Sequence, residues 1–112
     1  MVTVTIVKSG TGGYAGLRVQ GHALYANAGS DIVCSAVSML TFNTLNSIDR
    51  FTKDTVTVVT QDEETGILDT VFAGEDGPVS EETTLLMQSY EMGVKELAKQ
   101  YKEVQVQVSK RG

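Results

Sequence analysis

The longest stretch of this chain without a charged side chain runs from Ile32 to Ile48. Residues at spacings of three and four within it define one face of a helix, namely Val33, Val37, Leu40, Thr44 and Ile48. Asp31 comes directly before the stretch and predicts the N-cap of a helix that extends to about Phe51. A helix this neutral needs cover on most of its sides, by a sheet on one side and by loops or a second subunit on another.

Alternating β-branched residues predict strands on either side of this helix. The expected strands cover residues 2–7, 14–20, 55–61, 66–73 and 104–108. A second helix is expected after Ser80, which caps it, with an apolar stripe of Leu86, Tyr90, Val94, Leu97 and Tyr101. The tail 110–112 is expected to fray. The order β-β-α-β-β-α-β predicts an α+β fold over residues 1–112, a single-domain sandwich with a mixed sheet of about five strands and helices on its faces.

Composition excludes several classes of function. Nine Lys and Arg against fourteen Asp and Glu give a net charge of -5, which disfavours nucleic-acid binding and suits a basic protein partner. Apolar runs near 18 residues and a signal-peptide pattern are both absent from the sequence, so we expect no membrane span and a cytoplasmic location. The single cysteine and single histidine cannot form an internal disulfide or a zinc site by themselves, and no metal or cofactor is expected.

His22 and Cys34 are the residues that could carry chemistry. A cysteine protease needs a thiolate and an imidazole within hydrogen-bond reach, and the imidazole takes the thiol proton and later protonates the leaving amine. Cys34 is expected in the first turn of the helix, where the helix dipole favours a thiolate. His22 is expected at the end of a strand, before a loop that could bring it over the helix start.

Two other interpretations of these residues remain open. Cys34 could be a small buried hydrophobe and His22 a surface residue, in a non-catalytic module that binds a ribosomal or other protein partner. Cys34 could also be a thiol redox sensor, although the chain holds no resolving cysteine.

Two segments resemble the signature of a known family. Residues 21–23 read G-H-A and residues 29–38 read G-S-D-I-V-C-S-A-V-S. At this separation they resemble the motifs of the ribosomal-processing cysteine protease family, called Prp, and the resemblance extends over the whole chain. It implies a homodimeric endopeptidase with His22 and Cys34 as catalytic dyad. Its substrate would be a large-subunit ribosomal protein precursor, which loses an N-terminal extension by a cut after an aromatic pair.

The same motifs include three supporting residues. Asp31 could orient His22 through its ring N–H or simply cap the helix, and the two roles are compatible. Ser38 lies one turn after Cys34 and could hydrogen-bond near the site or back to a helix carbonyl. Gly21 is expected to allow a backbone turn or a close approach of substrate.

The loop between the two motifs holds Leu24 and Tyr25, which are large and apolar for a loop. They could receive the apolar end of the substrate extension, or fold back onto the core. In the family this loop is thought to order when substrate binds. The backbone N–H of Cys34 is a candidate oxyanion donor.

Overall fold

The helices and strands follow the predicted order β-β-α-β-β-α-β in a computed structural model that describes residues 1–21 and 32–111. The elements are β1 (Val2–Ser9), β2 (Tyr14–Gln20), α1 (Ile32–Phe51), β3 (Thr55–Asp62), β4 (Ile67–Ala73), α2 (Glu81–Gln100) and β5 (Val104–Arg111).

The five strands form one sheet in the order β3-β4-β2-β1-β5. Neighbouring strands are antiparallel except β1 and β5, which run parallel from Val2 opposite Val104 to Ser9 opposite Arg111. The predicted mixed sheet is therefore confirmed. The first and last strands of the chain lie side by side, and β3 and β5 are the two edges.

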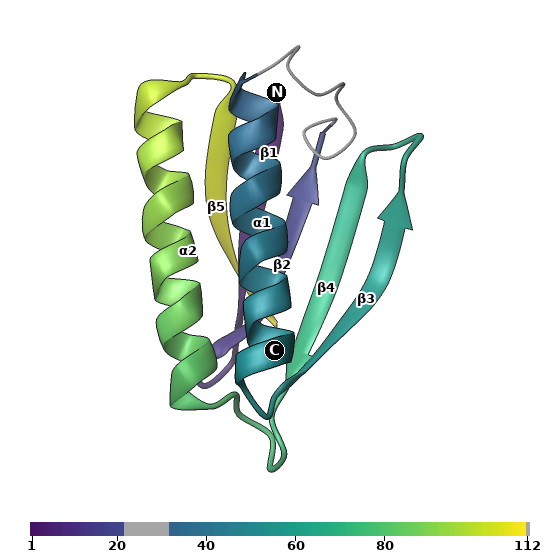
Figure 1. The fold of residues 1–112 in the computed structure, drawn as a ribbon, viewed down its shortest axis with the longest axis vertical. Coiled ribbons are helices and arrows are strands. Elements are labelled where there is room, and N and C mark those ends of the chain that lie inside the picture. The colour runs from purple at the N-terminus through teal and green to yellow at the C-terminus, as the bar shows by residue number, and fades with distance from the viewer. Residues whose placement is uncertain (22–31, 112) are drawn as a thin grey trace.

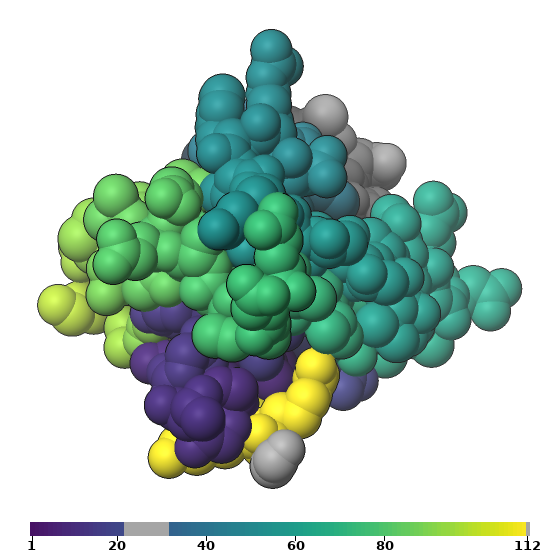
Figure 2. Space-filling model, turned by 90° about the horizontal axis from the view of Figure 1, so that it is seen from below, coloured from purple at the N-terminus to yellow at the C-terminus, as the bar shows by residue number. Residues whose placement is uncertain are grey.

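Both helices lie on the same face of the sheet (Figure 1). From the end where α1 stops, Figure 2 shows α1 and α2 on one side of the molecule, with the turn after β1 and the end of β5 on the other. The sequence analysis expected helices on both faces of the sheet, whereas in the structure both helices cover the same face and the other face is open. The uncovered face carries polar side chains such as Gln20 and Gln107, which are exposed.

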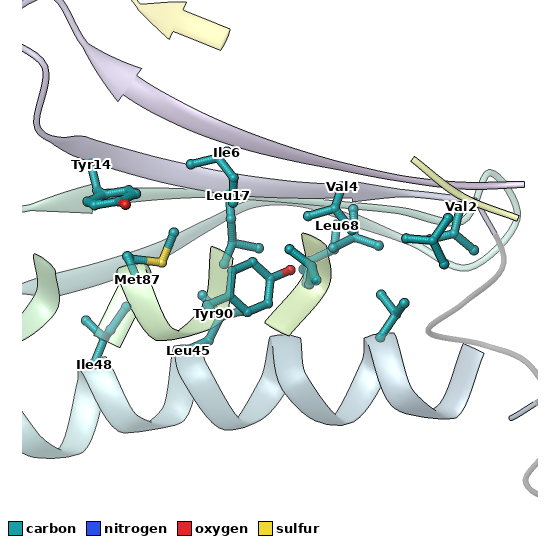
Figure 3. Close-up of a cluster of buried hydrophobic side chains, with 14 of the residues drawn as sticks. Val2, Val4, Ile6, Tyr14, Leu17, Leu45, Ile48, Leu68, Met87 and Tyr90 are labelled. Atoms are coloured by element: carbon teal, nitrogen blue, oxygen red, sulfur yellow. The ribbon is translucent and has the colours of Figure 1, made fainter. Parts of the chain in front are cut away.

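The core fills the space between the sheet and the two helices. Ile6, Leu17 and Leu68 point from the strands toward Ile48 of α1 and Tyr90 of α2 (Figure 3). All five side chains are at most 1% exposed. Because α1 presents its apolar stripe to this layer, its position is set by packing along most of its length.

The C-terminal residues differ from the sequence prediction. Lys110 and Arg111 were expected to fray, but β5 continues through both of them, opposite Lys8 and Ser9 of β1. The parallel pairing with β1 supplies their backbone with partners, which a local pattern cannot reveal.

Asp54 joins the end of α1 to the start of α2. Its carboxylate accepts hydrogen bonds from the Ser80 backbone N–H at 2.8 Å and from the Ser80 hydroxyl at 2.6 Å. The Ser80 hydroxyl in turn accepts from the Thr83 N–H, so the predicted N-cap is confirmed. Burial alone would raise the pKa of Asp54, but the hydrogen bonds led by Ser80 outweigh it and hold that pKa below its ordinary value.

Candidate active site

Cys34 lies in the first turn of α1, as predicted. Its side chain is 8% exposed and packs in the core cluster beside Val33 and Val37. The N-terminal end of a helix dipole attracts negative charge, so the first turn of a helix is a position where proteins place reactive cysteines.

Gly21 follows β2 and has a backbone conformation that disfavours other residues. Its φ is +118°, and a Cβ there would lie 2.5 Å from the carbonyl oxygen of Met1. Its N–H donates to the carbonyl of Gly66 at 2.9 Å. This positive φ fits the backbone turn expected at Gly21, and the start of this same chain lies close to it. The close approach of substrate to Gly21 stays a prediction.

The fold brings Gly21 and Cys34 to one end of the molecule. The end of β2 and the start of α1 both lie at the upper end of the view in Figure 1. Gly66 is at that end as well, because it precedes β4 and accepts from Gly21. Two segments that are separated in the sequence by residues 22–31 therefore lie at the same end of the molecule.

The other predicted site residues divide into two groups. Ser38 lies on α1 one turn after Cys34 and is half-buried. His22, Leu24, Tyr25 and Asp31 lie outside the described residues, and their roles remain predictions.

A buried hydrogen bond between the helices positions α1. The hydroxyls of Thr41 and Tyr90 are 2.9 Å apart, and the two residues are 0% and 1% exposed. Burial raises the pKa of Tyr90 to about 12, although the hydrogen bond with Thr41 acts in the opposite direction. Thr41 was not singled out from the sequence. The sequence feature that could have indicated Thr41 is its position seven residues after Cys34, which places its hydroxyl on the same face of the helix, two turns further along.

The residues that the structure describes hold no group of three or more His, Cys, Asp or Glu side chains arranged to bind a metal ion. Among the same residues, neither helix has the length and apolar character that crossing a membrane requires.

One known protein family matches nearly the whole chain. The family model described as cysteine protease Prp matches residues 1–106. No curated protein matches the chain significantly.

Solved structures share the fold over nearly the whole chain. The crystal structure of SMU.848 from Streptococcus mutans is 25% identical, with a TM-score of 0.79, and the match covers 99% of each chain. An essential ribosomal processing protease Prp from S. aureus, in complex with a covalently linked product peptide, is 22% identical with a TM-score of 0.78. That match covers 99% of this chain and 100% of the other.

Proposed function

The chain belongs to the cysteine protease Prp family, and from this premise we propose that it removes the N-terminal extension of a large-subunit ribosomal protein precursor. Cys34 is the nucleophile and His22 is the general base and acid in this proposal. The observation that carries it is Cys34 in the first turn of α1, in a chain whose match to the family model includes both motifs. The S. aureus protease of the same fold, solved with a covalently linked product peptide, gives further support.

The reaction proceeds in two steps. His22 takes the thiol proton, and the sulfur of Cys34 attacks the scissile carbonyl carbon. The C–N bond then breaks, His22 returns the proton to the leaving amine, and a thioester to Cys34 remains. Water, deprotonated by His22, hydrolyses the thioester and restores the thiol. Asp31 supports the imidazolium or caps α1, and Ser38 lies one turn beyond the nucleophile.

The substrate side of the proposal follows from the family and from charge. The cut falls after a pair of aromatic residues, and Leu24 and Tyr25 receive the apolar extension before it. A net charge of -5 attracts a basic ribosomal protein. Since ribosomal proteins are made in the cytoplasm, the enzyme acts there, as one catalytic domain over residues 1–112.

The test is cleavage of a peptide with an apolar stretch that ends in two aromatic residues and continues with Ala-Ser. Mass spectrometry should find one cut after the aromatic pair. Cys34→Ala should abolish it, while Ser35→Ala, a change at the exposed neighbouring position, should leave the rate within about twofold. No cut by the folded protein, together with slow alkylation of Cys34, would contradict the proposal.

His22 is tested separately from Cys34. His22→Ala should lose cleavage while Cys34 remains open to alkylation, because the sulfur persists without its proton acceptor. Full cleavage by this variant would remove His22 from the mechanism.

We also propose that the enzyme is a homodimer. Support comes from the outer side of α1, where Met39 is 70% exposed and the neighbouring Ser35 and Asn43 are uncharged and exposed. A second copy would cover this neutral surface. Sedimentation should give twice the chain mass, and Met39→Lys should shift the protein toward monomer. A monomeric wild-type protein at all concentrations would refute the dimer.

A further inference from the structure

A hollow of about 290 Å³ lies between α1 and the outer strands β3 and β4. Leu45 and Leu68, which are buried, line it together with Phe42, Val56 and Val58, which are only partly covered or exposed. Its volume corresponds to roughly ten water molecules. It is therefore suited to one or two side chains of a polypeptide rather than to a larger small-molecule ligand.

The strand beside this hollow is an unprotected sheet edge. Within residues 1–21 and 32–111, β3 pairs only with β4, and Figure 1 shows no helix or strand beyond it. It carries no charged residue before Asp62, whereas the other edge strand, β5, ends in Lys110 and Arg111. Charged side chains are a common means by which proteins block pairing at an edge. An edge without them can accept an extended peptide by main-chain hydrogen bonds.

One acidic side chain, that of Asp49, lines the hollow. Three further acidic residues, Asp62, Glu63 and Glu64, directly follow the lining residue Gln61 in the chain. The nearby cations are engaged elsewhere. The Arg50 guanidinium lies 5.9 Å from the Phe51 ring centre. Lys53 lines a separate hollow with Glu75, Asp76, Glu81 and Glu82.

We propose that this hollow and the edge of β3 bind the basic segment of the substrate that follows the cleaved bond. This inference rests on the proposed function. Lys and Arg side chains combine an apolar stem with a cationic head, so their stems fit against Phe42 and Val58 while their heads face Asp49. Ribosomal proteins are rich in such residues because they bind RNA phosphates.

Charge distinguishes this occupant from a second copy of the chain. A two-fold symmetric contact through β3 would place the same patch of each copy against the other. The carboxylates around the two hollows would then be brought together, which is unfavourable. A basic peptide instead neutralises them.

The distance from the nucleophile to the hollow sets the peptide length required. Cys34 precedes Phe42 by eight residues and Asp49 by fifteen along α1, which corresponds to about 12 Å and about 22 Å of helix. An extended peptide covers these lengths with roughly four and seven residues. Contacts with the hollow therefore begin about four residues beyond the cleaved bond and reach Asp49 near the seventh.

The test compares a long peptide, with eight residues including several lysines after the cleaved bond, and a short one with two. Val58→Lys places a cation in the hollow, whereas Leu85→Lys adds the same charge on α2, outside the hollow and away from the β3 edge. The two residues are 51% and 67% exposed. Val58→Lys should raise the KM of the long peptide about tenfold, which corresponds to about 1.4 kcal/mol. The kcat of Val58→Lys and its rate with the short peptide should stay within twofold, and Leu85→Lys should change none of these values.

A second pair of variants tests the charge. Asp49→Asn should raise the KM of the long peptide severalfold, and Glu103→Gln, which removes an exposed carboxylate remote from the hollow, should not. The advantage of the long peptide over the short one should also decrease as salt is added.

Several outcomes would overturn the inference. An unchanged KM in Val58→Lys, with normal cleavage, would remove the hollow from substrate binding and leave the proposed function intact. A change from dimer to monomer in Val58→Lys with unchanged KM would assign the hollow to contact between copies. If neither peptide is cleaved, the proposed function fails. In that case the affinity of the long peptide for Cys34→Ala, measured by fluorescence anisotropy, tests the hollow separately. Adding Val58→Lys should weaken this affinity, and an unchanged affinity would exclude the hollow as the binding site.

Discussion

The hydrogen bond between Thr41 and Tyr90 allows a sharp test of how α1, and with it Cys34, is held. Both hydroxyls lie in the core, 2.9 Å apart, with 0% and 1% of the residues exposed. Tyr90→Phe removes one hydroxyl and leaves the other buried without its partner. Thr41→Val does the same from the other side, with little change of shape.

The expected magnitudes follow from burial. An orphaned buried hydroxyl costs about 1–3 kcal/mol, whereas replacing both partners by apolar groups of similar shape is close to neutral. Each single variant should therefore lower the free energy of unfolding by about 2 kcal/mol. The double variant should lose clearly less than the sum of the two, with a coupling of about 1–3 kcal/mol.

Urea unfolding followed by circular dichroism measures these differences. With a denaturant dependence of about 1–3 kcal/mol per M, a loss of 2 kcal/mol moves the midpoint by about 1 M. Tyr101→Phe is the control, because Tyr101 is only half-buried. The reasoning would be refuted if the double variant lost as much free energy of unfolding as the two single variants together. It would also be refuted if Tyr90→Phe unfolded with the same free energy as the wild type.

Alkaline pH supplies a second readout for the same residue. The pKa of Tyr90 is raised from 10.0 to about 12 by burial, so the folded state keeps the phenol protonated where the unfolded chain ionises. The contribution is fully present below pH 10 and is lost as the pH rises toward 12. Tyr90→Phe should therefore weaken the decline of stability between these values. An equally steep decline in the variant would contradict the role of burial.

Three further predictions concern stability. Gly21→Ala should cost about 2–3 kcal/mol in urea unfolding, because its Cβ would lie 2.5 Å from a carbonyl oxygen at a φ of +118°; Gly13→Ala, without either constraint, should be near neutral. Asp54→Asn should cost about 1–3 kcal/mol at pH 7. Because the pKa of Asp54 is lowered in the folded state, the wild type should lose this advantage as the pH falls from about 4 through that pKa, and a constant gap between the two midpoints would contradict this. Tyr14→Phe removes the 2.7 Å hydrogen bond that the Tyr14 hydroxyl donates to Glu91, and should lower the free energy of unfolding by only about 0.5–1.5 kcal/mol. Because burial raises the pKa of Tyr14 to about 12, the same variant should remove one phenol from the titration near pH 12.

The candidate site was partly readable from the sequence. Asp31 and the neutral run after it located the start of α1, so the first-turn position of Cys34 followed from local pattern. The two motifs supplied the family resemblance. The sequence did not indicate that the carbonyl of Met1 lies beside Gly21, because that contact joins the ends of two different strands.

The sequence by itself determined the helices and strands, because alternation, helical spacing and capping depend on residues a few positions apart. The Ser80 cap and the span of α1 are examples. Only the tertiary structure decided that both helices share one face and that β5 pairs with β1 through Arg111. It also decided that Thr41 meets Tyr90 across the two helices. These contacts join residues far apart in the chain, and they form because the whole apolar surface is buried together, which no single segment encodes.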